Sequence, residues 1–261
     1  MDIVIMLCIG ALAGMSAGLL GIGGGIIIVP ALAIIFETQQ IDIDVLMHLA
    51  IGTSLATIVI TSLSSVWAHQ KKQAIDWSVV RIMAIGVFIG GISGAMLANF
   101  IQGIDLKRVF SIFIFLIAAQ MFYSKKIKAH RKLPAKTAMM SVAGIIGMIS
   151  SLMGVGGGSM SVPFLTWCNV SIRKAVAISS AIGFPIAVSG TIGFIIIGWD
   201  APGRPGMSLG FVYLPAFLSI IIASTLFAPV GAWLAHRVPV ELLRRFFIAF
   251  LLILALRMLL S

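Results

Sequence analysis

Two glycine-rich runs contain the residues of this chain that are best suited to binding chemistry. They read Gly21-Ile22-Gly23-Gly24-Gly25 and Gly154-Val155-Gly156-Gly157-Gly158. Glycine allows close backbone approach and positive φ angles, so successive amide N–H groups can converge on one point. A helix that begins just after such a run adds the positive end of its dipole. The runs therefore predict an anion cradle of backbone amides, formed by Gly23, Gly24, Gly25, Gly156, Gly157 and Gly158.

Hydroxyl side chains near each run are candidates to complete this cradle. Thr53-Ser54 and Ser179-Ser180 stand on the apolar segment that follows each run, at equivalent places, and Ser159 directly follows the second run. Hydroxyls suit an oxyanion because they donate hydrogen bonds without adding charge. The structural alternative is a hydroxyl bond to its own helix, with glycines that merely allow tight helix crossing.

The other polar residues argue against catalytic, metal or nucleotide chemistry. We find no paired aspartates, His-Glu-x-x-His motif or Ser/His dyad, and the lysine of a nucleotide P-loop is missing after the glycines. Glu37 and Asp200 lie at segment ends, which disfavours a cation pump built around buried carboxylates. We therefore expect no enzyme activity and no cofactor. Four histidines also lie near segment ends, where we expect solvated or interfacial rings: His48, His69, His130 and His236.

The glycine runs belong to an internal repeat. At an offset of 133 residues, the four glycines, a valine and a proline of 21–30 match those of 154–163. At an offset of 137, residues 93–121 resemble 230–258. A repeat at a fixed period indicates duplicated structural units. The chain thus divides into a first repeat at 1–123, a basic linker at 124–136 and a second repeat at 137–261.

Composition places these repeats in a membrane. Apolar residues make up 60% of the chain and charged residues 10%, whereas a soluble domain has about a quarter charged residues. The net charge of +10 is dispersed over loop ends, which fits positive-inside topology and lipid headgroups rather than nucleic acid. We predict an all-α integral membrane protein with eight hydrophobic segments, at 3–36, 45–67, 79–100, 106–123, 137–169, 174–198, 208–235 and 240–260.

The first segment of each repeat is too long for one ordinary crossing. As a continuous helix, residues 3–36 would extend about 51 Å, against a hydrocarbon core of about 30 Å. Both first segments are interrupted by glycines followed by a proline. Each then either crosses once, giving eight spans, or turns back at the glycines as a re-entrant hairpin. The second topology gives six spans and inverted repeats.

The distribution of Lys and Arg favours the hairpin topology. With hairpins, 14 of these residues lie on one side of the membrane and 4 on the other; with eight spans the split is 11 to 7. Because cytoplasmic loops are enriched in Lys and Arg, the stronger bias supports inverted repeats with a cytoplasmic linker. Both termini are then expected outside.

The repeated sequences GLLGIGGGIIIVP and SLMGVGGGSMSVP resemble the sulfite exporter TauE/SafE family, also called the four-toluene-sulfonate uptake permease family. The resemblance covers essentially the whole chain. It implies transport of a small sulfur-containing anion, such as sulfite, thiosulfate or sulfoacetate, across the cytoplasmic (inner) membrane of a prokaryote. It also implies a binding role for the glycines of both runs. The expected partners are that solute and membrane lipid, with a homodimer left open.

The sequence suggests how such a transporter would operate. Discontinuous segments at matching places in two halves point to a shared site and to alternating access. An inside-negative potential helps an anion leave by about 2.3 kcal/mol per charge per 100 mV, so export is slightly favoured over uptake. An anion channel and a non-transporting assembly or sensor subunit are the rival functions.

Overall fold

The computed structural model describes residues 2–20, 24–71, 73–123, 133–235 and 240–260. The described chain is helical except for one short two-stranded hairpin and the connections. The helices of the first half are α1 (Asp2–Leu20), α2 (Gly25–Thr38), α3 (Ile43–Lys71), α4 (Trp77–Ala98) and α5 (Gly103–Tyr123). The second half has α6 (Lys136–Leu152), α7 (Gly158–Trp167), α8 (Ile172–Ile197), β1 (Ser208–Leu209), β2 (Val212–Tyr213), α9 (Leu214–Ala235) and α10 (Val240–Leu260).

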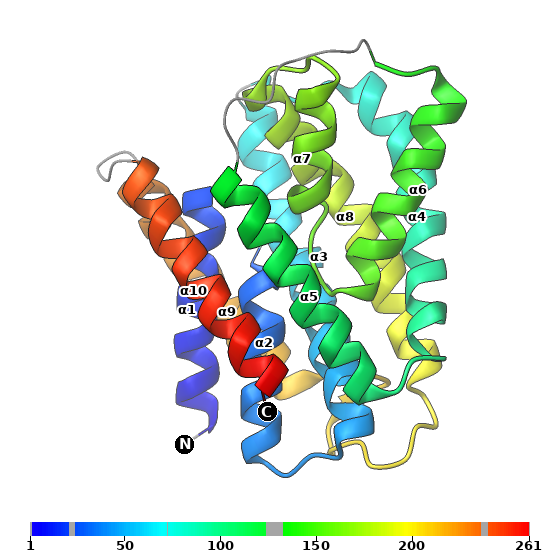
Figure 1. Ribbon diagram of the computed structural model, residues 1–261, viewed down its shortest axis with the longest axis vertical. Helices are drawn as coiled ribbons and strands as arrows, with labels where there is room; N and C mark the ends of the chain where they lie inside the picture. Colours follow the sequence, from blue (N-terminus) through cyan, green and yellow to red (C-terminus); the bar gives the residue numbers. More distant parts are fainter. Residues whose placement is uncertain (1, 21–23, 72, 124–132, 236–239, 261) are drawn as a thin grey trace.

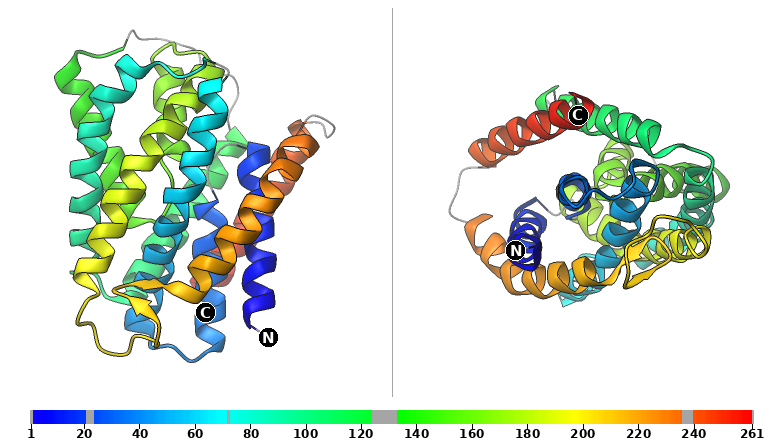
Figure 2. Two further views of the ribbon diagram at one scale, coloured as in Figure 1. Left: turned by 180° about the vertical axis from the view of Figure 1, so that it is seen from behind. Right: turned by 90° about the horizontal axis from the view of Figure 1, so that it is seen from below.

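The helices form an elongated bundle, and each half opens with an antiparallel pair of helices. In Figure 1, α1 rises from the N-terminus and α2 descends towards the same end, while α6 descends from the opposite end and α7 returns to it. Helices α3, α4 and α8 run most of the length of the bundle, and α9 runs obliquely beside α1 (Figures 1 and 2). Both termini therefore lie at one end, and α6 begins at the other (Figure 1).

The first helix of each half packs against a helix of the other half. Helix α1 packs along α9 of the second half, and α6 packs along α4 of the first half. Helix α3 lies against α8, and α5 lies against α10. Figure 2 shows the α5–α10 pair on one side of the bundle, away from α1 and α9. Under the predicted repeat, the α1–α9 contact corresponds to the α4–α6 contact, and all four contacts join one half of the chain to the other.

Small residues permit the closest helix contacts. Gly86, Gly90 and Gly94 lie on one face of α4 against the backbone of α6, where an added Cβ would overlap carbonyl oxygens of α6. Gly10 and Gly14 of α1 contact the backbone of α9 in the same way. Lipid tails are as apolar as helix surfaces, so packing of this kind, rather than a hydrophobic driving force, holds membrane helices together.

The outer surface suits lipid. Large exposed apolar side chains such as Ile85, Phe115 and Leu218 face outwards from α4, α5 and α9. Four helices, α3, α4, α5 and α8, are long and apolar enough to cross a membrane, and α2 and α6 are shorter apolar helices. The chain is therefore an all-helical protein with several helices capable of spanning a bilayer, as the composition predicted.

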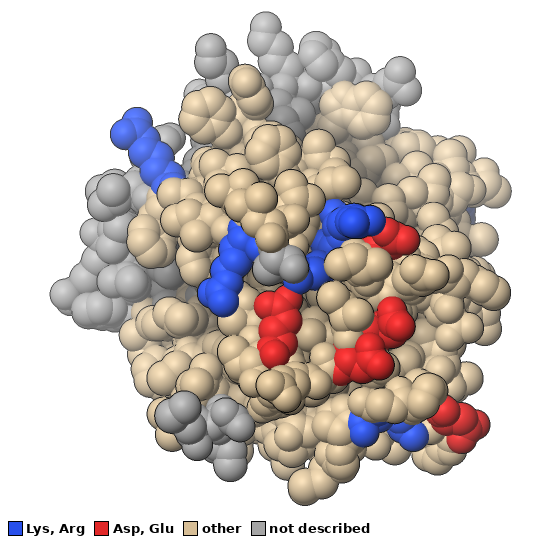
Figure 3. Space-filling model, turned by 60° about the horizontal axis from the view of Figure 1, so that its bottom comes forward, with Lys and Arg blue, Asp and Glu red and all other residues tan. Residues whose placement is uncertain are grey.

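Charged residues lie at the ends of these helices. Figure 3 shows acidic and basic side chains gathered on the end of the molecule that carries the termini. There, the buried ammonium of Lys107 pairs with the Glu37 carboxylate at 2.5 Å and joins α5 to α2. At the opposite end, Asp76 caps α4 by accepting hydrogen bonds from the hydroxyl and amide of Ser78. The Ser78 hydroxyl holds the pKa of Asp76 below its ordinary value.

One predicted segment was wrong in part. Residues 208–235 were expected to form a single apolar segment, but 208–213 form the β1–β2 hairpin and α9 begins at Leu214. Met207 and Gly210 both have positive φ angles, which a helix does not contain. The amide of Phe211 donates to the carbonyl of Phe194 at 3.1 Å, so the hairpin is anchored on α8.

The α4–α6 contact leads to the first prediction. Gly90→Ala should lower the free energy of unfolding by about 1–3 kcal/mol, because the methyl group would overlap the Gly144 carbonyl and force the helices apart. Gly144→Ala is the matched control, since its methyl group would meet the Gly86 oxygen at an ordinary 3.6 Å. The measurement is thermal unfolding in detergent, and equal losses in the two variants would contradict the packing argument.

Candidate functional site

The two glycine runs meet inside the bundle. Gly25, the first residue of α2, lies so close to the second run that an added Cβ would overlap the Gly154 carbonyl and approach the Val155 Cα to 3.1 Å. Gly24 packs against Ala13 of α1, and Gly23 lies outside the described residues. Residues of the two runs, well over a hundred positions apart in sequence, are therefore in direct backbone contact.

The second run forms a helix-ending turn. Gly154 has a φ of +64°, a conformation in which L side chains are strained. Its amide donates to the Ser151 carbonyl at 3.1 Å, and the Val155 amide donates to the Ser150 carbonyl at 2.9 Å. This pair of bonds with a left-handed glycine is the Schellman motif that ends α6. Gly154 is thus required by the backbone, a role distinct from the binding role predicted for the other glycines.

Two helices begin at this junction without a side-chain cap. Gly24 precedes α2 and Gly157 precedes α7, and within the described residues neither helix start has a capping side chain. The first amide N–H groups of any helix lack partners inside that helix. The two helices run from the junction towards opposite ends of the bundle (Figure 1). Their positive dipole ends consequently lie close together, in an arrangement that attracts negative charge.

Hydroxyl groups surround the second turn. The Ser54 hydroxyl of α3 donates to the Gly154 carbonyl at 2.8 Å. The Ser161 hydroxyl of α7 donates to the Gly157 carbonyl, and its oxygen lies 2.7 Å from the Ser179 hydroxyl of α8. Of the predicted hydroxyl residues, Ser54 and Ser179 are therefore connected to the turn.

The other two predicted hydroxyls on these helices are engaged elsewhere. The Thr53 oxygen accepts a hydrogen bond of 2.9 Å from the Tyr213 amide, which fastens the β1–β2 hairpin to α3. Ser180 donates to the Val176 carbonyl of its own helix at 3.0 Å. For Ser180 this is a bond to its own helix, the alternative to anion binding that was considered for these hydroxyls from the sequence.

Three buried hydroxyls flank the turn without a hydrogen-bond partner among the described residues. They are Ser150 and Ser151, at the end of α6, and Ser159, in the first turn of α7. A buried polar group normally has a partner, so an orphan group calls for an explanation. Ser159 was predicted from sequence, whereas Ser150 and Ser151 were missed. Their signal was a Ser-Ser pair ending an apolar helix directly before the glycines.

Apolar side chains close the junction in this conformation. The Ile58 side chain of α3 lies against both runs, 2.9 Å from a Cβ built on Gly25 and 3.7 Å from one built on Gly156. Gly157 lies against Ile186 of α8. Apart from His48 and Lys107, the buried polar side chains of the described residues are all Ser or Thr. An anion at the junction would therefore meet amides and hydroxyls, and no buried carboxylate of the described chain.

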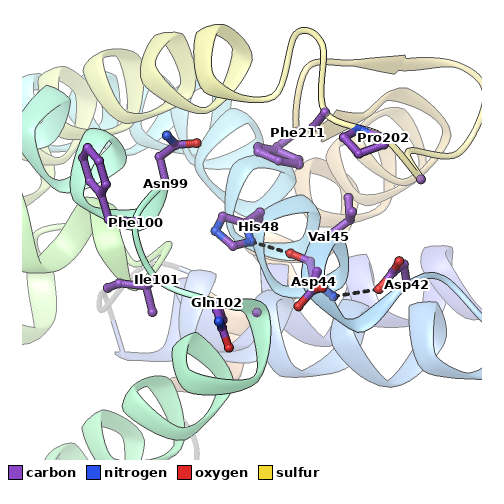
Figure 4. Close-up of a pocket in the computed structure, with 13 residues that line it drawn as sticks. Asp42, Asp44, Val45, His48, Asn99, Phe100, Ile101, Gln102, Pro202 and Phe211 are labelled. Atoms are coloured by element: carbon purple, nitrogen blue, oxygen red, sulfur yellow. Dashed lines mark hydrogen bonds between the residues drawn. The ribbon is translucent and has the colours of Figure 1, made fainter.

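A solvent-accessible pocket lies apart from the glycine runs. It has a volume of about 480 Å³ and is lined by the α2–α3, α4–α5 and α8–α9 connections (Figure 4), which lie at the end that carries the termini (Figure 1). Its thirteen lining residues are Asp42, Asp44, Val45, His48, Asn99, Phe100, Ile101, Gln102, Gly103, Ala201, Pro202, Gly203 and Phe211.

His48 was wrongly predicted to be a solvated or interfacial ring. It is only 5% exposed, because Phe211 of the hairpin stacks on it at 5.1 Å and Phe194 of α8 packs beside it. Of the other three histidines, His69 is half-buried near the end of α3, and His130 and His236 lie outside the described residues. Among the described residues, no group of three His, Cys, Asp or Glu side chains is arranged to hold a metal ion.

Comparison with known proteins covers nearly the whole chain. A family model described as "Sulfite exporter TauE/SafE" matches residues 6–258. A "Probable membrane transporter protein" of Haemophilus influenzae is 39% identical, and the match covers 99% of this chain and 98% of that one. The "Probable membrane transporter protein MJ0441" of Methanocaldococcus jannaschii is 30% identical over 87% of this chain and 81% of its own length. No solved structure matches.

The hydrogen bond between Ser54 and Gly154 leads to the second prediction. Ser54→Ala should destabilise the protein by about 1–3 kcal/mol, because it leaves the buried Gly154 carbonyl without its hydroxyl donor. Ser180→Ala, which removes only a bond within α8, is the matched control and should cost much less. Chemical denaturation in detergent measures both, and a Ser54→Ala protein as stable as the control would refute the proposed support of the turn.

Proposed function

Because the chain belongs to the sulfite exporter TauE/SafE family, we propose that it is a secondary transporter for a small sulfur-containing anion. Sulfite, thiosulfate and organosulfonates such as sulfoacetate are the substrates of that class. The observation that carries the proposal is the contact between the two glycine runs, where two uncapped helix starts lie together. Membrane transport itself is the function for which the relatives are named.

The chemistry of the junction favours an anion over a cation. Amide N–H groups at the starts of α2 and α7 are donors, and so are the unpartnered hydroxyls of Ser150, Ser151 and Ser159. Donors of this kind bind a sulfur oxyanion through its oxygens without placing a positive charge in the membrane interior. Gly23, Gly24, Gly25, Gly156, Gly157 and Gly158 remain the proposed backbone ligands, with Ser159 the nearest hydroxyl in sequence.

We further propose that the α1–α2 and α6–α7 pairs are re-entrant and that the halves are inverted repeats. The α1–α2 pair enters from the end with the termini, the α6–α7 pair enters from the opposite end, and each turns back inside the bundle. The α1–α9 contact of one pair matches the α6–α4 contact of the other. Six spans then cross the cytoplasmic membrane with the basic linker inside. Non-helical backbone at this depth is tolerated because it is buried in protein.

Transport would proceed by alternating access to one site. Rocking of one half against the other separates or closes the junction, and in the present conformation the Ile58 side chain fills the space against both runs. Because both glycine runs belong to the same copy, a homodimer is not needed to build the site. Export is the favoured direction, since the inside-negative potential drives an anion outwards.

The third prediction tests the site by flux. In proteoliposomes, Gly157→Leu and Gly24→Leu should reduce the initial rate of radiolabelled sulfite or sulfoacetate transport by about tenfold or more, because a leucine side chain at either position would crowd the junction. A tenfold loss corresponds to about 1.4 kcal/mol. Gly206→Leu, in an exposed loop with open space around it, is the control. Wild-type rates in both site variants would refute the site. Flux that does not saturate would indicate a channel instead of a transporter.

The fourth prediction tests the topology. Epitope tags at the two termini should be accessible from outside intact cells, whereas a tag within the linker 124–136 should be accessible only after the membrane is opened. Two re-entrant hairpins put three crossings between the N-terminus and the linker, and eight spans put four. A linker on the same side as both termini would therefore exclude the inverted arrangement.

A further inference from the structure

The pocket at the end carrying the termini contains a buried histidine with two acceptors. The Nδ1 atom of His48 lies 3.0 Å from the Asp44 carbonyl oxygen, and its Nε2 atom lies 2.9 Å from the Ala98 carbonyl oxygen. Carbonyl oxygens can only accept hydrogen bonds, and a neutral imidazole has only one N–H. Both contacts are hydrogen bonds only when both ring nitrogens carry hydrogen. A neutral ring can therefore make either hydrogen bond, and only the imidazolium ion can make both together.

The surroundings of His48 suit a positive charge that exchanges with water. Asp44 of α3 and Asp42 of the α2–α3 connection line the same pocket (Figure 4), and its lining includes no Lys or Arg. The other elements around the ring present uncharged groups: Asn99 and Gln102 from the α4–α5 connection, Phe194 from α8 and Phe211 from the hairpin. The pocket brings solvent to the ring, so protons can enter and leave.

The proton on His48 also holds helices together. Ala98 is the last residue of α4, and its carbonyl oxygen contacts both the Ile101 amide, at 3.1 Å, and the His48 ring. A positive charge there also interacts favourably with the negative end of the helix dipole. Loss of the proton removes one of the two hydrogen bonds and this charge interaction. The neutral ring can keep the Ala98 bond through its Nε2–H and give up the Asp44 bond within α3, so what protonation changes between α3 and α4 is the charge interaction.

Helix α3 connects this event to the proposed site. Ser54, which supports the glycine turn, lies six residues after His48, about 9 Å along the helix. Phe211 packs on His48, and two residues later the Tyr213 amide donates to Thr53. A displacement of this part of α3 or of the hairpin therefore reaches the residues that hold the turn.

We propose that His48 is the proton-binding site of this transporter, and that release of its proton changes the α3–α4 contact and so couples anion movement to proton movement. The inference rests on the proposed transport function and adds the coupling ion. By linkage, if protonation of His48 changes anion affinity, anion binding must change proton affinity by the same factor.

The test uses anions whose own charge stays constant. Thiosulfate and sulfoacetate do not titrate between about pH 6 and pH 8, so any effect of a pH gradient on their flux comes from the protein. In wild-type proteoliposomes, one pH unit should change steady-state accumulation by up to about tenfold for one proton per anion. His48→Gln should abolish this response but keep anion–anion exchange at equal pH. His69→Gln, near the other end of α3, is the matched control and should respond like wild type.

A second measurement does not require the His48 variant to fold. In a protein with His48 as its one histidine, made by replacing His69, His130 and His236 with Gln, ring-nitrogen NMR should show two protonated nitrogens at the acid end of a pH titration and one at the alkaline end. A ring that keeps one protonation state across the whole titration would overturn the inference. So would wild-type flux that ignores the pH gradient, or a His48→Gln protein that still responds to it. Absence of any anion flux in the wild type would overturn the proposed function and this inference with it.

Discussion

The backbone contact between Gly25 and Gly154 is the constraint on which the other features of the interior depend. Two polypeptide backbones approach so closely there that no side chain fits between them. Away from water, their polar groups need partners inside the protein. The Schellman bonds at Ser150 and Ser151 satisfy the amides of the turn, and the Ser54 hydroxyl satisfies its carbonyl. The first amides of α2 and α7 have no side-chain cap, so the same contact that closes the core also creates a place suited to an anion.

The two halves contribute unequally to this place. After the first run, α2 continues with Ile26, Ile27 and Ile28, all of them buried. After the second run, α7 has Ser159 and Ser161 at the corresponding positions. The proposed duplication accounts for the matching backbone breaks, while the side-chain donors belong mainly to the second half. Under the proposed function, both helix starts supply backbone amides, the side-chain hydroxyls come from α6, α7 and α8, and the side chains of α2 and Ile58 form an apolar surface.

Sequence patterns predicted the features that are local and missed those that depend on contacts between distant segments. Glycine runs and apolar stretches marked the helix breaks and most helix bounds, because backbone preference and hydropathy act over a few residues. The hairpin at 208–213 was missed, since its residues are as apolar as a helix and its anchor on Phe194 is a tertiary contact. His48 was misjudged for the same reason: it lies near a helix end, but Phe211 buries it. The orphan state of Ser150 and Ser151 likewise depends on their neighbours in space.

Helix α3 explains how one end of the molecule can influence its centre. Along its length it carries His48 at the pocket, Thr53 at the hairpin, Ser54 at the turn and Ile58 against both glycine runs. Packed helices shift as rigid units and do not deform continuously, so a small displacement at one of these contacts is transmitted to the others. Of these four contacts, Ile58 alone is purely apolar, and it occupies the space beside the turn. Movement of α3 is therefore the simplest change that would uncover the backbone amides, because it withdraws Ile58 and the Ser54 hydroxyl together.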